Sequence, residues 1–433
     1  MDGSALLDPP DDVAATAVIA PARLITWRLW YRWRLLLVLA GLASTGVVIV
    51  WAVQVYRTAP HAFVDLDVYR LGSSAWWHGR DIYGPLPRTV AGPLPFVYPP
   101  IAAAALAPLA AVTWQHAITI TLVGSMTGLA VTVYLTFLRV WPSAGRRGAV
   151  LATAVLLPGA LVLEPVWDTF WFGQINIVLM ALVVLDCLVD HPKWPRGVLI
   201  GVAAAIKLTP AVFVLYFLLR KDYRAAATAT ITGLAVTALG FAVSWSGSLK
   251  YWFGSSGGVR GISGSAYVTN QTLAATLTRW ALPKPTQTAL WVLGSVVLLV
   301  FAVAAIRRAN RLGDTPLAMV VTAGFGLLVS PTSWSNHWVY IAPALIVIAG
   351  QAWRRRSVPW LLALAAITYV FAEAPFLGLP SQGNRELRWT AAQWLPGNSF
   401  TVTAIVALVL FAAPDLPATF RAVRTRLVAI GGR

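Results

Sequence analysis

The sequence predicts an all-α polytopic membrane protein, and three observations support this prediction. Apolar residues make up 58% of the 433-residue chain, charged residues make up only 11%, and the mean hydropathy is +0.70. A soluble domain has about a quarter of its residues charged. A single soluble core cannot bury this much apolar surface, because long chains divide into domains with polar skins. A soluble enzyme, a disordered chain and a secreted disulfide scaffold are therefore excluded.

Apolar runs recur along the chain at the length that a bilayer requires, and about twelve transmembrane helices are predicted at roughly 20 residues for each crossing, although several runs are shorter. The predicted spans are 35–56, 101–115, 116–138, 147–163, 172–190, 197–219, 225–245, 288–306, 315–330, 337–353, 358–373 and 399–414. We expect residues 1–34 to form a cytoplasmic tail, residues 35–414 a single transmembrane domain, and residues 415–433 a basic cytoplasmic tail.

The basic residues predict the orientation. The first run follows several arginines and has no clear cleavage site, which favours an uncleaved anchor with a cytoplasmic N-terminus. Alternation then places the densest basic clusters inside, namely Arg220 to Arg224, Arg307 to Arg311 and Arg354 to Arg356. In a second topology, segment 101–115 is re-entrant and 207–210 breaks its helix, which moves the basic loops 139–147 and 191–196 inside. Both topologies place segments 57–100, 246–287, 331–336 and 374–398 outside, in the periplasm.

Two of these periplasmic segments, 57–100 and 246–287, are unusually long. Loops beyond about 15 residues are functional or disordered, and the many Trp, Tyr, Gly and Pro residues here favour order. We therefore expect two long ordered loops that build an outward-facing cavity with the start of the span at 337. The glycine-rich run 254–265 is expected to be either a flap over bound lipid or a plain linker.

The net charge of +17 is explained by basic cytoplasmic loops, so no nucleic-acid partner is expected. The sole cysteine, Cys187, cannot form an intramolecular disulfide. The five histidines form no HxxxH or HExxH pair, and no Rossmann glycine fingerprint occurs. The sequence therefore predicts neither a metal site nor a bound dinucleotide.

Rare charged residues close to the apolar runs are the candidate functional groups, because charge near the bilayer is costly. Asp65 and Asp67 follow the first run closely, and a carboxylate there is suited to accept a proton. The structural alternative is a helix N-cap, or an ion pair with Arg70 or Arg80.

Lys207 stands alone within the apolar stretch AAAIKLTPAVF. A lone lysine in a span suggests function, and a cation there would suit a phosphate. The alternative is a side chain that reaches the interface. Thr209 and Pro210 follow it and are expected to open the helix, which would free backbone groups for a ligand.

His337 opens a predicted span and is suited to donate a hydrogen bond to a phosphate or a sugar hydroxyl, although an interfacial helix start also explains it. Polar and aromatic residues in the segments predicted to lie outside are further candidates to bind a polar ligand. These are Asn270, Gln271, Trp334 and Asn336.

Gln174 and Asn176 are polar residues in another apolar run. A hydrogen bond between helices is their structural alternative. The twelve-span count places both on the cytoplasmic side, away from Asp65, and it leaves the positions of Glu164 and Asp168 open.

Six segments occur in the order of known family motifs. They are DLDVYRLGSSAWWHGRDIY (65–83), LPFVYPPIAAAALAPLA (94–110), WFGQINIVLMALVVLD (171–186), AAAIKLTPAVFVLYFLLRKDY (203–223), TNQTL (269–273) and SPTSWSNHWVY (330–340). Together they resemble glycosyltransferase family 87, membrane mannosyltransferases of the C-type fold from mycobacteria and their relatives. The similarity extends over residues 60–345, and the ordered set is more specific than any single motif.

The resemblance implies an inverting transfer of mannose from polyprenyl-phosphate-mannose to a phosphatidylinositol mannoside, with an α-1,2 linkage formed on the periplasmic face of the plasma membrane. It implies no metal, no other cofactor and no nucleotide sugar. Asp65, the first aspartate of a DxxVY pattern, is the implied base, with Asp67 as second choice. Lys207 and His337 are expected at the donor phosphate or sugar, with Arg70 and Arg80 as weaker candidates. The residues expected to bind the acceptor sugar are Asn270, Gln271, Trp334 and Asn336. An opening towards lipid is expected for the polyprenyl tail.

Three alternatives stay open at this point. Branching of lipomannan or lipoarabinomannan would use the same donor and linkage, and arabinofuranosyl transfer would use the same kind of site. A lipid or glycolipid transporter belongs to a different class, and it also needs many spans and rare intramembrane charges. No internal repeat is visible, and transport needs no pair of long aromatic outer loops, so the sequence favours an enzyme.

Overall fold

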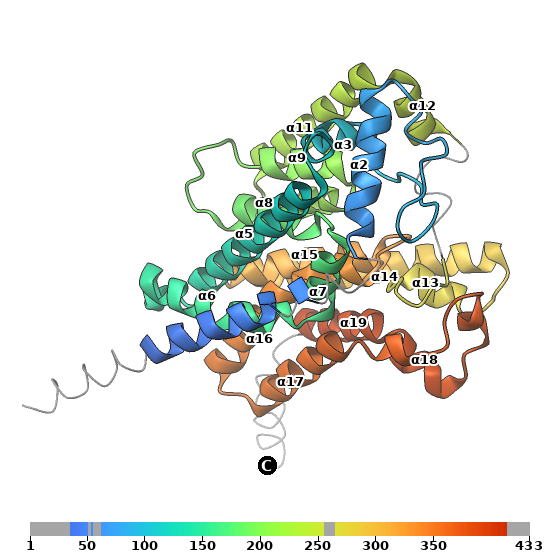
Figure 1. Cartoon of the computed structure of the whole chain (residues 1–433). Coiled ribbons are helices and arrows are strands. Elements are labelled where there is room, and N and C mark those ends of the chain that lie inside the picture. The colour runs from blue at the N-terminus through green and yellow to red at the C-terminus, as the bar shows by residue number, and fades with distance from the viewer. Residues whose placement is uncertain (1–34, 51–52, 55–61, 255–264, 414–433) are drawn as a thin grey trace, which may run out of the picture.

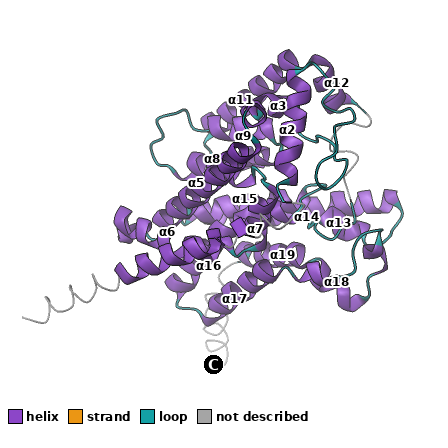
Figure 2. Ribbon diagram, viewed as in Figure 1, coloured by secondary structure: helices purple, strands orange, loops and turns teal. Residues whose placement is uncertain are grey.

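The computed structural model describes residues 35–50, 53–54, 62–254 and 265–413, and these fold into helices and loops (Figure 1). No β-strand occurs in these ranges (Figure 2). Within them the backbone forms the isolated β-bridges Thr89–Gly92 and Asn270–Trp334. The predicted all-α class is therefore confirmed. The predicted tails and residues 255–264 of the glycine-rich run lie outside the described residues.

The helices are mostly short, and many follow one another after a break of a few residues. The N-terminal part contributes Leu35–Val50, α2 (Val64–Trp77), α3 (Pro100–Ala105), α4 (Ala107–Ala111), α5 (Trp114–Val140), α6 (Gly145–Leu161), α7 (Glu164–Phe172), α8 (Asn176–Leu188), α9 (Val198–Ile206), α10 (Phe213–Leu219) and α11 (Tyr223–Val243). The C-terminal part contributes α12 (Trp245–Phe253), α13 (Leu273–Thr278), α14 (Lys284–Arg311), α15 (Thr315–Val329), α16 (Ile341–Arg355), α17 (Val358–Glu373), α18 (Ala391–Gly397) and α19 (Ser399–Ala412).

Among the described residues, α5, α11 and α14 are each long and apolar enough to cross a membrane. Two bent pairs pass the same test together: Pro142–Leu161 with Glu164–Phe172 at 77°, and Ala391–Gly397 with Ser399–Ala412 at 69°. Shorter apolar helices such as α8, α15 and α17 accompany them. The chain is thus a membrane protein with several broken helices, and the count of about twelve spans stays a prediction.

Segment 101–115 differs from its prediction. It forms the short helices α3 and α4, and Thr113 then caps α5 by accepting from the backbone N–H of His116. Pro108 has no N–H to donate, which favours an interruption of the helix just before it. The prediction of one continuous helix over 101–115 is therefore wrong. A short, broken segment is compatible with the second predicted topology, in which 101–115 is re-entrant.

The two long segments predicted to lie outside the membrane contain regular structure. Segment 57–100 includes α2, and segment 246–287 includes most of α12 and all of α13. Both segments therefore contain helices among their described residues, and their identity as long ordered periplasmic loops stays a prediction.

The helix predicted over 197–219 is broken at Lys207, as expected. α9 ends at Ile206, and Lys207 has an extended backbone with φ −148° and ψ 123°. The 3-10 helix η2 (Thr209–Val212) follows with Pro210 in its first turn, and α10 begins after it. Because the break turns the chain, the lysine side chain projects from an irregular segment rather than from the face of a continuous helix.

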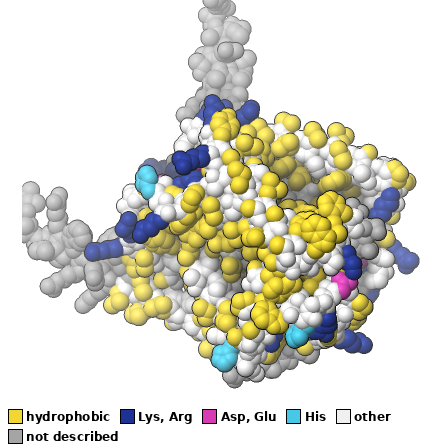
Figure 3. Space-filling view, turned by 90° about the horizontal axis from the view of Figure 1, so that it is seen from above, with side chains coloured by type: hydrophobic (Ala, Val, Ile, Leu, Met, Phe, Trp, Pro, Cys, Tyr) yellow, Lys and Arg dark blue, Asp and Glu magenta, His cyan; other side chains and the backbone are white. Residues whose placement is uncertain are grey.

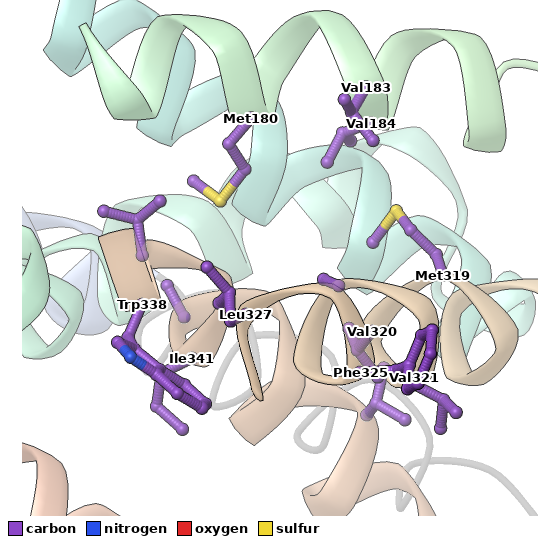
Figure 4. Packing of buried hydrophobic residues seen from close by; sticks show 14 of the residues in the cluster. Met180, Val183, Val184, Met319, Val320, Val321, Phe325, Leu327, Trp338 and Ile341 are labelled. Carbon is purple, nitrogen blue, oxygen red and sulfur yellow. The ribbon is translucent and has the colours of Figure 1, made fainter. Parts of the chain in front are cut away.

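The larger apolar cluster draws on many helices and includes the contact between α8 and α15. Met180, Val183 and Val184 of α8 point towards Met319 and its neighbours on α15 (Figure 4), and all are buried. Lipid is as apolar as these side chains, so close packing rather than burial from water holds helices together within a bilayer.

Small residues bring α9 and α11 into close contact. A Cβ added to Gly201 would lie 2.6 Å from the carbonyl oxygen of Ala229, which is closer than real Cβ atoms come. Glycine at this position therefore permits the two helices to pack backbone to backbone.

One face of the molecule is broadly apolar, with Lys and Arg mainly near its rim (Figure 3). Exposed large apolar residues on α11 include Ile231, Leu234 and Leu239. An apolar surface of this extent is not expected to face water, which agrees with a membrane protein.

Candidate active site

A cavity of about 380 Å³ lies between the start of α2, the break at Lys207 and the segment before α16. It is lined by Asp65, Val97, Tyr98, Pro99, Gln174, Lys207, Leu208, Thr209, Val212, Tyr251, Gly326, Val329, Ser330, Pro331, Thr332, Trp334, Asn336 and His337. The cavity thus combines a carboxylate, an amine and an imidazole with amides and aromatic rings.

Asp65 lies in the first turn of α2. The helix begins after Phe63, which has a left-handed backbone (φ 62°) and whose N–H donates to the carbonyl oxygen of Trp171 at 2.7 Å. This contact ties the start of α2 to the end of α7, so that Asp65 meets Gln174 just beyond it. Gln174 Nε2 donates to Asp65 Oδ2 at 3.0 Å.

Burial raises the pKa of Asp65 to about 6, although the hydrogen bond from Gln174 and the charge of Lys207 both act to lower it. Asp65 is therefore ionised at neutral pH, yet it binds a proton more readily than an exposed aspartate. A pKa close to the operating pH suits a general base.

Two tyrosines fix the side-chain amide of Gln174. The Tyr69 hydroxyl donates to Gln174 Oε1 at 2.7 Å, and Gln174 Nε2 donates to the Tyr98 hydroxyl at 3.0 Å. Because Oε1 is the acceptor for Tyr69, the NH₂ group is the end that faces Asp65. Asp65 and Tyr69 are four residues apart on α2 and therefore share one face of the helix.

The cationic side of the cavity is built around Lys207. Its Nζ donates to Asn176 Oδ1 at 2.7 Å, lies 3.1 Å from His337 Nε2 and stands 5.5 Å from the centroid of the Tyr98 ring. An ammonium group has only donors, so His337 accepts through Nε2 and is neutral in this arrangement.

Asn176 also connects this side of the cavity to the 3-10 helix η4 (Ser335–Tyr340). Its Nδ2 donates to the carbonyl oxygen of Asn336 at 2.8 Å, and Thr169 Oγ1 donates to the same oxygen at 3.1 Å. The start of α8 and the end of α7 therefore position His337 through the backbone next to it.

Asn270 and Gln271 are fully buried and hold the segment that carries Trp334. Asn270 Oδ1 accepts from the N–H of Ser333 at 3.1 Å, and the N–H of Gln271 donates to the Ser333 carbonyl oxygen at 2.9 Å. Gln271 Nε2 donates to the carbonyl oxygen of Gly397 at 2.9 Å. These side chains bind neighbouring protein groups rather than line the cavity.

The comparison with known families decides what kind of protein this is. Residues 96–331, more than half of the chain, match the family model described as glycosyltransferase family 87. The chain belongs to glycosyltransferase family 87. The family and the enzyme class that the motifs predicted are therefore confirmed.

Relatives of this family 87 chain cover nearly its whole length. A polyprenol-phosphate-mannose-dependent alpha-(1-2)-phosphatidylinositol mannoside mannosyltransferase of Mycolicibacterium smegmatis is 42% identical over 91% of this chain and 90% of its own length. A Mycobacterium tuberculosis protein of the same name is 39% identical over 87% and 90%. A Mycobacterium tuberculosis polyprenol-phosphate-mannose-dependent alpha-(1-2)-phosphatidylinositol pentamannoside mannosyltransferase is 31% identical over 81% and 88%. No solved structure gives a significant match.

Five of the predicted site residues meet at the cavity of this family 87 chain. They are Asp65, Lys207, Trp334, Asn336 and His337. They come from three separate sequence motifs, so the resemblance and the geometry converge on one place.

The other predicted residues of the first outer segment point elsewhere. Asp67 does not line the cavity, because residues two apart on a helix do not share a face. Arg70 donates to the carbonyl oxygens of Leu109 and Val112, and its guanidinium lies 5.7 Å from the Trp114 ring centroid. Arg80 is exposed and does not line the cavity either.

The expected separation of Gln174 and Asn176 from Asp65 is wrong, while the side of the membrane on which they lie stays a prediction. Gln174 touches Asp65 and Asn176 touches Lys207. The prediction assumes continuous spans, whereas α3 and α4 are short and α7 turns into α8 at Gly173 (φ 67°). The sequence feature that marks these two residues is the pair of amides beside a glycine in WFGQIN. Their contact with the Asp65 side of the cavity is visible only in the tertiary structure.

Two further acidic residues lie behind the cavity wall. Glu164 is buried with 5% of its surface exposed, and Asp168 Oδ2 accepts from Ser335 Oγ at 3.5 Å. Neither lines the cavity. No group of three or more His, Cys, Asp or Glu residues within the described ranges is arranged to hold a metal, and a metal-free reaction stays a prediction.

Proposed function

We propose that this chain is an inverting, polyprenyl-phosphate-mannose-dependent α-1,2-mannosyltransferase whose acceptor is a phosphatidylinositol mannoside. The observation that supports it most directly is one cavity lined by both Asp65 and Lys207. A base and a phosphate-binding cation are the two groups that such a transfer needs. The relatives at 42% and 39% identity are named for this donor, linkage and acceptor.

In the proposed reaction, the acceptor hydroxyl attacks C1 of the mannose while Asp65 takes the hydroxyl proton. The bond between C1 and the phosphate oxygen breaks, and its electron pair leaves with polyprenyl phosphate. Because attack and departure occur on opposite faces, a β-linked donor gives an α-linked product. A single displacement requires no covalent intermediate on the enzyme.

Lys207 and His337 are the proposed partners of the donor phosphate. The phosphate gains charge as C1–O cleavage proceeds, so a preorganised cation stabilises the transition state more than the ground state. Tyr98 and Asn176 keep the ammonium in place through the ring and the amide oxygen described for them.

Trp334 and Asn336 are the proposed contacts of the acceptor sugar, because both line the same cavity. Asn270 and Gln271 support them from behind through the Ser333 backbone. In this proposal their effect on acceptor binding is indirect.

We propose that the protein crosses the plasma membrane with about twelve spans and that the cavity faces the periplasm. The proposed periplasmic segments are 57–100, 246–287 and 374–398, and the proposed cytoplasmic tails are 1–34 and 415–433. α16 supports this orientation, since it begins next to the cavity and ends at Arg354 and Arg355. Fifteen helical residues separate these ends by about 22 Å, and basic residues favour the cytoplasmic side.

The test is a membrane assay with radiolabelled polyprenyl-phosphomannose, a panel of phosphatidylinositol mannosides, and wild type beside Asp65→Asn. Label that enters a longer phosphatidylinositol mannoside only with wild type supports donor, acceptor and base together. Label that enters lipomannan or lipoarabinomannan instead supports the branching alternative. No transfer to any glycolipid, with movement of lipid across the membrane, would support a transporter and refute the proposal.

A further inference from the structure

Arg279, which directly follows α13, is a buried arginine with only 4% of its surface exposed. Its guanidinium donates to four carbonyl oxygens of the loop before α13, those of Ala266, Tyr267, Val268 and Asn270, at 2.8 to 3.2 Å. A guanidinium has five N–H donors in a fixed planar arrangement and no acceptor, so a ring of carbonyl oxygens suits it. One buried side chain therefore sets the path of this loop.

The same guanidinium also holds the chain just before α19. Arg279 Nη1 donates to Asn398 Oδ1 at 2.6 Å and to the carbonyl oxygen of Gly397 at 3.4 Å, and Cζ lies 5.1 Å from the centroid of the Trp389 ring. A Cβ added to Gly397 would lie 2.1 Å from that ring, closer than real Cβ atoms come, so glycine permits this packing. Arg279 thus joins segment 374–398 to the loop before α13.

The buried charge of Arg279 is stabilised by the opposite charge of Glu386, which is 1% exposed. Glu386 Oε1 accepts from the N–H of Val268 at 3.2 Å and from the N–H of Gln382 at 3.3 Å. Arg279 and Glu386 therefore hold one loop, the first through its carbonyl oxygens and the second through one of its N–H groups. Removal of either charge would leave the other buried without compensation, so a test of Arg279 must conserve its charge.

The loop that Arg279 holds is paired with the segment that carries Trp334. Asn270 and Trp334 form an isolated antiparallel bridge, and the side chain of Asn270 accepts from the N–H of Ser333 at 3.1 Å. The rings of Tyr267 and Trp334 meet edge to face, with their centroids 6.2 Å apart. Trp334 lines the catalytic cavity and Arg279 does not. A continuous set of contacts therefore leads from the buried guanidinium to the cavity wall.

We propose that Arg279 is a positioning residue for the acceptor, because it holds Trp334 in place at the cavity; this inference rests on the proposed function. Trp334 is the proposed contact of the acceptor sugar, and such a contact requires a side chain that its surroundings hold in position. The donor side is held by other groups, since Lys207 contacts Asn176 and Tyr98. A change at Arg279 should therefore affect the acceptor and spare the donor.

The proposal gives segment 374–398 a part in acceptor binding although none of its residues lines the catalytic cavity. Asn398, Gly397 and Trp389 contact the guanidinium, and Glu386 shares its loop. In this inference the segment acts through Arg279 and not through contact with a ligand.

The test is the KM for each substrate in Arg279→Lys, measured at a saturating concentration of the other substrate. Lysine keeps the charge but replaces the planar group of five donors with a compact group of three, so most of the loop contacts are lost. The KM for the phosphatidylinositol mannoside acceptor should rise roughly tenfold, the order of effect of one lost hydrogen bond to a charged group. The KM for polyprenyl-phosphomannose should stay at its wild-type value. An equal rise for both substrates, or no rise for the acceptor, would overturn the inference.

Arg196 supplies the matched control, because it also donates to loop carbonyl oxygens. These belong to Asp186, Val189 and Asp190, near the far end of α8 from the cavity. The 13 residues of α8 extend for about 20 Å. Arg196→Lys should lower the Tm and leave both KM values unchanged. A rise in acceptor KM in this variant would show that any loosened loop has the effect, and it would refute a specific role for Arg279.

Hydrogen exchange provides a measurement that does not depend on turnover. Arg279 donates to no group of residues 330–336 within the described part of the chain, so a change there would travel through Asn270. Backbone amides of 330–336 should exchange faster in Arg279→Lys than in wild type, and those of α8 should not. Unchanged exchange in 330–336 would overturn the inference. If wild type transfers mannose to no acceptor, the proposed function fails, and the exchange data still decide whether Arg279 holds Trp334.

Trp389→Phe serves as the second variant if Arg279→Lys does not fold. It leaves every hydrogen bond of the guanidinium in place and weakens the contact with the aromatic ring, because phenylalanine attracts a cation less than tryptophan does. Acceptor KM and exchange of residues 330–336 should both rise, by less than in Arg279→Lys, at an unchanged donor KM. A rise in donor KM, or no change in either quantity, would contradict the proposal.

Discussion

Gln174 donates a hydrogen bond from Nε2 to Asp65 Oδ2 over 3.0 Å, although 109 residues separate the two in the chain. The donor is oriented by Tyr69, which bonds the opposite end of the same amide at 2.7 Å. A hydrogen bond to the charged form of an acid favours ionisation. The contact therefore does two things for the proposed base: it fixes the carboxylate in the cavity, and it opposes the effect of burial on its pKa.

Gln174→Leu should impair turnover through the protonation of Asp65. Loss of the hydrogen bond raises the pKa of Asp65 above its value of about 6, so more of the base is protonated at a given acidic pH. The acidic limb of the pH profile of kcat/KM should move up by roughly one pH unit, which corresponds to about 1.4 kcal/mol for a lost bond to a charged group. Tyr69→Phe leaves the amide in place and should give a smaller shift in the same direction. A uniform loss of activity at every pH would show that Gln174 acts only on the fold.

Asp65→Asn should abolish transfer while preserving or raising thermal stability. Removal of a general base costs roughly 10²- to 10⁴-fold in rate. The folded-state pKa of about 6 lies above the ordinary value of 3.8, so ionisation of Asp65 opposes folding above pH 6, and this penalty is absent below pH 3.8. Asparagine is neutral at every pH and removes the penalty.

The measurement that checks this prediction is the Tm of purified wild type and Asp65→Asn at pH 8, made beside the mannose-transfer assay. An inactive variant with an equal or higher Tm supports the role of base. A large fall in Tm would attribute the lost activity to folding, and activity close to wild type would remove Asp65 from the reaction.

The sequence was informative where chemistry is local. Lys207 was expected at a break because threonine and proline follow it, and α9 does end just before it. Asp65 and His337 are rare polar groups near apolar runs, which predicts a functional role, and both line the cavity. Such residues stand out because an unpaired polar group near lipid is costly, a cost that is visible in composition alone.

Contacts between residues that are distant in the sequence are not predictable from composition. Continuous apolar runs do not predict which residues meet when helices break or turn back, so they do not predict the contact between Gln174 and Asp65. Asn270 and Gln271 have the amides of sugar-binding residues, yet their partners are neighbouring protein groups. Amide composition does not distinguish a ligand contact from a loop support, because both satisfy the same donors and acceptors.

Lys207→Ala should weaken use of the donor. The ammonium is the proposed contact of the leaving phosphate, and a hydrogen bond to a charged group contributes about 1.5–3 kcal/mol, so kcat/KM for the donor should fall roughly 10- to 100-fold. Lys207→Arg keeps the charge but not the fit to Asn176 Oδ1 at 2.7 Å, and it should recover part of the loss. The check is donor kinetics at saturating acceptor. Unchanged donor kinetics in Lys207→Ala would reduce the lysine to a side chain that reaches the interface.

Arg70 provides the converse test, because it is predicted at the donor phosphate but donates its hydrogen bonds to backbone carbonyl oxygens. Its guanidinium caps the carbonyl oxygens of Leu109 and Val112, close to the start of α5. Arg70→Met keeps the aliphatic stem and removes these bonds from half-buried carbonyl groups, and a hydrogen bond to a charged group contributes about 1.5–3 kcal/mol. The Tm and the yield of folded protein should fall, while the KM for the donor in the folded fraction should equal that of wild type. Arg80→Ala should change neither quantity. A selective rise in donor KM at unchanged Tm would return Arg70 to the phosphate site, because only a ligand contact weakens binding without weakening the fold.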